Sequence, residues 1–135
     1  MKRKKDRYYF FLNPYIDNAF TRCPECSGKT RVRKIPLAIM LEKEKIFLCL
    51  NKTCKYCPYC ELIIAKKQEI EDMLKIFLGR EELGEEDYLV FGTQDKKIWR
   101  KGLKHEVDQE ELYKGITLFK DVWDFKVVGC DPKDK

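Results

Sequence analysis

Two copies of the motif Cys-Pro-X-Cys carry the clearest chemical signal in this chain. Cys23 and Cys26 form the first pair, and Cys57 and Cys60 form the second. A spacer of two residues lets both thiolates of a pair converge on one cation, and two such pairs supply the four soft ligands that tetrahedral Zn²⁺ prefers. The spacing therefore predicts one structural zinc ion per chain, held by these four cysteines.

A further cysteine leaves the second pair open. Cys54 stands three residues before Cys57, so these two residues also form a pair with a two-residue spacer. In both copies of the motif, however, proline follows the first cysteine. This repetition favours Cys60 as the fourth ligand, with Cys54 as the alternative.

The second pair also admits a redox interpretation. A thioredoxin-like dithiol needs one Cys-X-X-Cys at the start of a helix, where the helix dipole lowers the thiol pKa. Cys57 and Cys60 precede an expected helix, so a thiol oxidoreductase is one hypothesis. Duplication of the pair argues against it, because a redox dithiol needs only one. Four thiolates also leave zinc no open position for catalysis, and we expect a binding module, not an enzyme.

Cysteine content and the N-terminal residues bear on the compartment. Seven cysteines in 135 residues fall below the roughly 8–10% that marks small secreted disulfide scaffolds. The basic residues 1–7 precede only a short apolar stretch, 8–12, and no apolar run approaches the roughly 18–20 residues that span a bilayer. We therefore expect a cytoplasmic protein without a membrane partner.

Charge is unevenly divided along the chain. Residues 1–67 hold 16 Lys and Arg against 6 Asp and Glu, whereas residues 68–135 hold 12 against 17. A basic half can bind a polyanion, so RNA or DNA is a candidate partner. The competing interpretation is that nearby cations balance the negative charge that four thiolates leave on Zn²⁺. The candidate nucleic-acid contacts are Arg22, Lys29, Arg31, Arg33 and Lys55.

The segments between the two motifs must bring them together. Residues 30–41 are rich in β-branched and apolar side chains, and 46–50 can return as an antiparallel strand. A hairpin places its two ends side by side, so the cysteine pairs would meet at its root. Pro36 should confine the first of these strands to a sheet edge or mark a bend. An earlier strand is expected over 8–12.

The second half of the chain shows mixed patterns. Apolar residues at helical spacing predict a helix over about 66–78. Residues 88–92 and 97–100 suggest a second hairpin joined through 93–95. Asp108 and Glu111 resemble a capping box that starts a short helix ended by Gly115. A last strand is expected over 122–128.

These expectations combine into an α+β fold. A basic tail, 1–7, precedes a β-rich zinc-ribbon lobe over 8–65, and a small α+β lobe over 66–130 precedes a polar tail, 131–135. The lobes are one domain or two, and the oligomeric state is open. A protein-interaction or structural adaptor is the alternative to nucleic-acid binding.

Three segments resemble an uncharacterised family of prokaryotic zinc-ribbon-containing proteins. They are 20–26 (FTRCPEC), 50–60 (LNKTCKYCPYC) and 88–93 (YLVFGT). The resemblance covers most of the chain and implies a structural zinc ion, but it brings no activity. The cysteine motifs alone also resemble zinc ribbons of the transcription and translation machinery, which is weak support for nucleic-acid binding.

Overall fold

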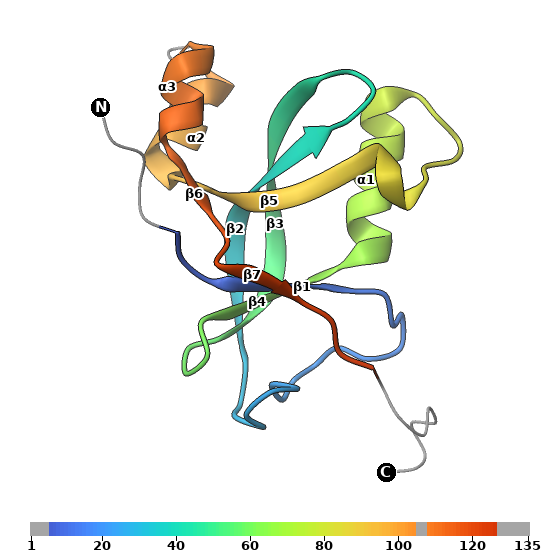
Figure 1. Cartoon of the computed structure of the whole chain (residues 1–135), viewed down its shortest axis with the longest axis vertical. Coiled ribbons are helices and arrows are strands. Elements are labelled where there is room, and N and C mark those ends of the chain that lie inside the picture. Colours follow the sequence, from blue (N-terminus) through green and yellow to red (C-terminus); the bar gives the residue numbers. More distant parts are fainter. Residues whose placement is uncertain (1–5, 105–107, 127–135) are drawn as a thin grey trace.

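Seven strands and three α-helices make up the computed structural model, which describes residues 6–104 and 108–126 (Figure 1). The fold class is α+β, as the sequence predicts. The strands are β1 (Tyr9–Asn13), β2 (Arg31–Leu41), β3 (Ile46–Cys57), β4 (Leu62–Lys66), β5 (Tyr88–Gln94), β6 (Ile116–Leu118) and β7 (Asp121–Trp123). The helices are α1 (Lys67–Leu78), α2 (Lys96–Leu103) and α3 (Gln109–Lys114), with a 3₁₀ turn at Glu85–Asp87. Residues 1–5 and 131–135, in the expected tails, lie outside the described residues.

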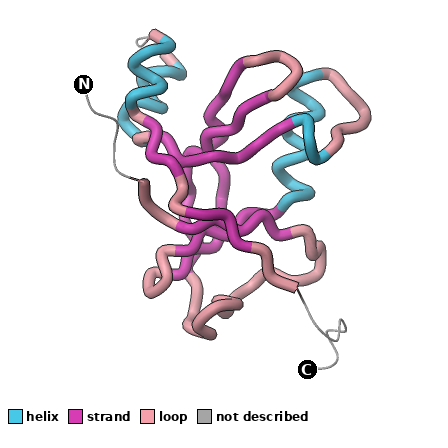
Figure 2. The backbone as a smooth tube through the Cα atoms, viewed as in Figure 1, coloured by secondary structure: helices cyan, strands magenta, loops and turns pink. Residues whose placement is uncertain are grey.

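The seven strands belong to one sheet, in the order β6-β5-β2-β3-β4-β1-β7. Strands β1 to β4 precede α1 and strands β5 to β7 follow it, so the sheet draws on both expected lobes. Pairings are antiparallel except those of β1, which runs parallel to β4 and to β7. Figure 2 shows that the strands curl instead of lying flat.

One short segment joins the two edges of this sheet. β6 pairs with β5 at one edge and β7 pairs with β1 at the other, although only Phe119 and Lys120 separate β6 from β7. Two backbone hydrogen bonds fix the joint: Arg7 N–H donates to the Leu118 carbonyl (2.9 Å) and Lys120 N–H donates to the Tyr8 carbonyl (2.8 Å). The sheet therefore closes around an interior, and alternate residues of each strand face inward or outward.

The β2–β3 hairpin forms the longest pairing in the sheet. Its register runs from Arg31 opposite Tyr56 to Leu41 opposite Ile46. Both expected strands of this hairpin are confirmed, and β3 continues to Cys57. The second cysteine motif therefore lies at the root of the hairpin, next to the residues that follow the first cysteine motif.

Pro36 does not confine β2 to an edge, because β2 lies between β3 and β5. β5 pairs with β2 only from Leu37 to Leu41. Pro36 lies one residue before that pairing, so the donor that proline lacks is not needed there. The expected edge position of the strand was therefore wrong, although Pro36 itself has no partner on the β5 side.

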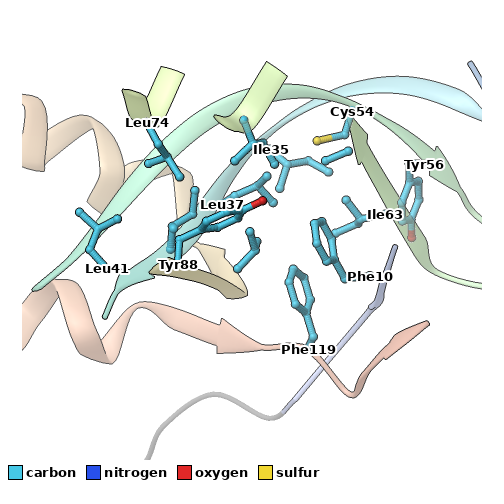
Figure 3. Packing of buried hydrophobic residues seen from close by; sticks show 14 residues of the cluster. Phe10, Ile35, Leu37, Leu41, Cys54, Tyr56, Ile63, Leu74, Tyr88 and Phe119 are labelled. Carbon is cyan, nitrogen blue, oxygen red and sulfur yellow. The ribbon is translucent and has the colours of Figure 1, made fainter. Parts of the chain in front are cut away.

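Inward-facing side chains form the main core, which we call the interior cluster (Figure 3). Four alternate residues of β2 contribute to it, and α1 adds Ile70 and Leu74 near the end of the sheet where β5 begins. The interior cluster consists of Phe10, Ile35, Leu37, Ile39, Leu41, Cys54, Tyr56, Ile63, Ala65, Ile70, Leu74, Tyr88, Val90 and Phe119.

Outward-facing side chains of β1 and β4 form a smaller second core, the outer cluster. Phe11 and Ile64 alternate with their inward neighbours Phe10 and Ile63, as strand geometry requires. Residues 14–30, which we call the knuckle loop, cover this face with Phe20 and Cys23. The outer cluster consists of Phe11, Phe20, Cys23, Cys57, Leu62 and Ile64.

Two of the helices agree with the sequence. α1 begins at Lys67 and ends where Gly79 adopts a left-handed φ of 68°, a conformation that favours glycine. α3 begins after Asp108, whose carboxylate accepts the Glu111 N–H at 2.8 Å, and ends at Gly115. None of the helices in the described ranges has the length and apolar character needed to cross a membrane.

Two expected strands were wrong or incomplete. Residues 97–100 lie in helix α2, because the Asp95 carboxylate accepts the N–H groups of Lys97 (2.9 Å) and Ile98 (3.1 Å) and caps a helix there. β5 pairs with β2 and with β6 instead. The last strand is confirmed only as Asp121–Trp123, and its expected end at 127–128 lies outside the described residues.

Candidate metal centre

The structure brings four cysteine sulfurs into one group. The Sγ atoms of Cys23, Cys26, Cys57 and Cys60 all lie within 4.8 Å of one another. Cys23 Sγ is 4.0 Å from Cys60 Sγ, and Cys26 Sγ is 3.6 Å from Cys57 Sγ. Sulfurs bound at about 2.3 Å around a tetrahedral metal lie about 3.8 Å apart, whereas a disulfide needs about 2.05 Å. The four side chains can therefore bind one metal ion.

The β2–β3 hairpin positions these ligands. Cys57 is the last residue of β3, and Cys60 lies in the turn before β4. The first pair lies in the knuckle loop. A β-bridge between Arg22 and Lys29 connects the two sides of this loop on either side of the cysteines. The expectation that a hairpin root unites the two motifs agrees with this arrangement.

Backbone N–H groups point at the sulfurs of both motifs. Such donors stabilise negative charge on a thiolate and orient the ligand. The donor and acceptor pairs are Glu25 N–H to Cys23 Sγ (3.3 Å), Gly28 N–H to Cys26 Sγ (3.4 Å) and Cys60 N–H to Cys57 Sγ (3.4 Å). The loops are thus shaped to hold thiolates, not only to bury thiols.

The two motifs share an unusual backbone turn. The residue after the second cysteine has a positive φ in each case, 64° at Ser27 and 56° at Glu61. Non-glycine residues rarely adopt this conformation and do so at a cost of about 1 kcal/mol or more. Both loops therefore share this backbone conformation directly after their second cysteine. The Cys-Pro-X-Cys repeat in the sequence therefore corresponds to a repeated local structure.

The environment of the thiols differs within the group. Burial raises the pKa of the Cys23 and Cys60 thiols, whereas the hydrogen bond from the Gly28 N–H lowers the pKa of Cys26. Four ionised thiols this close together repel one another unless a cation lies between them. A divalent metal ion bound between the sulfurs would supply the positive charge that stabilises all four thiolates.

Cys54 lies apart from this group. It belongs to the interior cluster, where its thiol donates to the Lys52 carbonyl at 3.4 Å and burial raises its pKa to about 12. Cys54 and Cys57 are three residues apart on the same strand, so their side chains point to opposite faces. The alternative pairing of Cys54 with Cys57 at one metal does not fit this geometry.

The geometry also bears on the redox hypothesis. Cys57 and Cys60 lie in a turn between two strands, and β4 separates them from helix α1. No helix N-terminus is therefore available in this part of the structure to lower their pKa as in a thioredoxin-like site. The expected helix is present, but it begins at Lys67 and not at the cysteines.

The five basic residues predicted to contact nucleic acid do not share one surface. Arg22 and Lys29 face each other across the bridge in the knuckle loop. Arg31 and Arg33 lie on β2, and Arg33 lines a cavity inside one end of the curled sheet. Lys55 lines a different hollow, on the outer face. The structure therefore separates this set into at least three places.

The sequence interpretation missed a basic helix. Because residues 97–100 were expected to form a strand, the positive charges of this segment were not recognised as lying on one element. The available signal was Asp95, a favoured N-cap residue directly before two lysines. The cations of α2 and its C-cap are Lys96, Lys97, Arg100, Lys101 and Lys104.

Comparison of the chain with protein-family models, with curated proteins and with solved structures finds no match. The resemblance of the cysteine segments to a zinc-ribbon family therefore stays a prediction. The function has to be inferred from the residues and their geometry.

Proposed function

We propose that this protein is a binding module that holds one structural Zn²⁺ ion through Cys23, Cys26, Cys57 and Cys60. The observation that supports it is the pair of sulfur–sulfur distances, 3.6 and 4.0 Å, which bracket the spacing of a tetrahedral four-thiolate site. Tetrahedral sulfur ligation suits zinc or iron. The arrangement is that of a zinc ribbon, in which two knuckles share one ion at the root of a hairpin.

The proposed role of the ion is structural. Four thiolates complete a tetrahedral coordination shell, so no position is left for a water molecule or a substrate. The ion would fasten the knuckle loop to the turn between β3 and β4, over the outer cluster. The binding energy of such an ion becomes folding energy for the segments that it joins.

Metal analysis tests this proposal. Protein purified under reducing conditions without chelators should contain about one zinc per chain, and a colourless solution would exclude an iron site. Cys26→Ser and Cys60→Ser should lose the metal, whereas Cys54→Ser should keep it. A folded wild-type protein without metal would overturn the proposal.

Nucleic-acid binding by the basic N-terminal half is a second candidate function. The observation in its favour is that Arg22, Lys29, Arg31 and Arg33 are all exposed and therefore accessible to phosphates, although they do not share one surface. Binding through phosphates weakens steeply as salt rises, because condensed counterions are released. Titration of a labelled oligonucleotide at several salt concentrations tests it, and an absence of binding at low salt would rule it out.

A further inference from the structure

The curled sheet contains a cavity of about 210 Å³, which we call the mouth cavity. The strand pairings place it at one end of the sheet, because residues near the start of β4, near the end of β3 and at the end of β5 line it, together with part of β2 and the residue before β1. Ile35 and Ile63 give it apolar walls, and Tyr8 and Tyr56 border it. An engineered apolar cavity of about 150 Å³ admits benzene, so this one has room for a single flat ring.

Arg33 lines this cavity with its guanidinium over an aromatic ring. Its guanidinium lies 4.7 Å from the centre of the Tyr56 ring, and Tyr56 is itself buried against Tyr8, with ring centres 5.9 Å apart. Within the described residues, Arg33 forms no ion pair. A guanidinium stacked on an aromatic ring keeps its N–H fork free for a phosphate.

Lys96 supplies a second cation at the same cavity and begins a row of positive charge. It lines the cavity as the first residue of α2. Arg100 and Lys104 follow at intervals of four residues, so the three side chains lie along one side of the helix. Lys96–Leu103 contains no acidic residue, and none of these three cations has an ion-pair partner in the described ranges. A row of cations without ion pairs among the described residues attracts a polyanion.

We propose that the mouth cavity and helix α2 form a binding site for single-stranded nucleic acid. The phosphate of one nucleotide lies between Arg33 and Lys96, its base enters the cavity, and the neighbouring phosphates follow Arg100 and Lys104. This inference rests on the second candidate function above and places the site on the inner face of the sheet, because the cavity-lining Tyr56 points to the opposite face from the adjacent ligand Cys57.

The cavity and the helix together favour a strand over other polyanions. A duplex keeps its bases stacked and paired, so it cannot insert one into a cavity at low cost, whereas the bases of a single strand are free. A free nucleotide would use the cavity but would leave Arg100 and Lys104 without a role. The proposed ligand uses both features at once.

Two double variants separate this site from the knuckle loop. Arg33→Ala/Lys96→Ala removes two charges at the cavity, and Arg22→Ala/Lys29→Ala removes two charges at the knuckle loop as a matched control. All four side chains are exposed, so both variants should fold and keep their metal. Lys34→Ala is a second control, because Lys34 is adjacent to Arg33 on β2 and points to the opposite face.

The measurement is fluorescence anisotropy of labelled 12-nucleotide RNA and DNA strands with the zinc-loaded full chain. Loss of both cations that contact this phosphate should weaken binding by about tenfold or more and lower the slope of log Kd against log salt by about 0.7 in the cavity variant. Both control variants should change affinity by less than about threefold. Arg33→Lys keeps the charge but not the fork, and should recover only part of the loss.

The remaining outcomes overturn the inference in distinguishable ways. Loss of binding in the knuckle variant but not in the cavity variant would move the site back to the N-terminal basic residues and leave the second candidate function intact. No binding by the wild-type chain would exclude both nucleic-acid ideas and leave the zinc proposal to metal analysis. Equal affinity for a mononucleotide such as AMP and for the strand would assign the cavity to free nucleotides.

Discussion

The two faces of the curled sheet are stabilised by different means. The interior cluster contains 14 buried residues from strands on every side and from α1, whereas the outer cluster contains six. Two of those six, Cys23 and Cys57, belong to the metal centre. The outer face thus has less apolar burial, and part of it consists of ligands.

The covering segments differ in the same way. The interior is enclosed by the sheet itself, whose backbone groups are paired along the strands. The knuckle loop has no helix or strand, and its position relies on local contacts such as the Thr30 hydroxyl donating to the Phe20 carbonyl at 2.8 Å. A segment with so little core of its own commonly needs a metal or a disulfide to stay folded. The proposed metal ion would therefore do on the outer face what apolar burial does inside the sheet.

Metal removal should therefore have the largest effect, and it should be confined to the outer face. Structural zinc contributes on the order of 10 kcal/mol of apparent binding energy at neutral pH. After chelation, amides of residues 20–30 should exchange with solvent much faster, while amides of the β2–β5 pairing keep most of their protection. Exchange measured by mass spectrometry tests this, with Cys54→Ser as the metal-retaining control. Loss of protection throughout the sheet in a single step would show that the two faces are not independent.

The sequence predicts that the two Cys-Pro-X-Cys motifs come together. Whether Cys54 can join Cys57 as a ligand depends on the length of β3, which the sequence did not predict. Cysteines with a two-residue spacer converge when they lie in a turn, and they diverge when they lie in an extended strand. The expected strand ended at residue 50, which left both geometries open for Cys54. Since β3 runs to Cys57, both residues lie in an extended strand and their side chains diverge.

Two other features of the fold were not predicted from the sequence, for different reasons. The parallel pairings of β1 join Tyr9 to Leu62 and to Asp121, and nothing in a short window of sequence encodes such distant partners. Helix α2 was missed for the opposite reason, because Ile98 and Trp99 favour a strand locally while the cap at Asp95 decides for a helix. The long-range pairing of β1 has no local signal in the sequence. The cap at Asp95 is such a signal, but the strand preference of Ile98 and Trp99 was given more weight.

Adjacent phenylalanines on β1 give the next largest effect and a direct comparison of the two faces. Phe10 points inward and stacks on Phe119 (4.7 Å between ring centres), whereas Phe11 points outward against Phe20 (5.3 Å) and Phe125 (5.1 Å). Replacing either buried ring by alanine should cost about 3–5 kcal/mol. Urea unfolding of the zinc-loaded variants measures this cost.

Zinc affinity should distinguish these two variants. Phe11→Ala loosens the surface beneath the knuckle loop and should release zinc more readily to a competing chelator, whereas Phe10→Ala should hold it as the wild type does while the chain remains folded. Equal zinc affinity in both variants would contradict the assignment of Phe11 to the metal-supported face.

A smaller effect is expected at the ion pair that links the sheet to α1. Lys52 is buried on β3 and donates to the carboxylate of Glu69, which is half-exposed. Glu69→Gln would leave the buried ammonium without its charged partner. Because the carboxylate is half-exposed, the free energy of unfolding should fall by only about 2 kcal/mol. Urea unfolding at neutral pH checks the value, and Gln68→Ala on the exposed side of α1 is the control.

The same pair gives a pH dependence with a defined sign. The Lys52 ammonium lowers the pKa of Glu69 below its ordinary value of about 4.3. The stabilisation is therefore fully present above that unfolded-state value and is lost as pH falls through the lower folded-state value. Wild type and Glu69→Gln should differ at pH 7 and converge in acid. A constant difference down to pH 2 would contradict this account.

The smallest effect is expected at Cys54, which lies on the inner face of the sheet, apart from the four cysteines of the metal centre. Serine is close in size to cysteine and can keep the donation to the Lys52 carbonyl, so Cys54→Ser should cost only about 1 kcal/mol for burying a more polar group. Zinc content should be unchanged.

In the wild-type protein, burial and a pKa of about 12 should keep the Cys54 thiol unreactive toward alkylating reagents even after chelation, while the exposed Cys26 reacts at once. Mass spectrometry of the alkylated protein would show the order of labelling, and rapid modification of Cys54 would mean that the interior opens whenever the metal leaves.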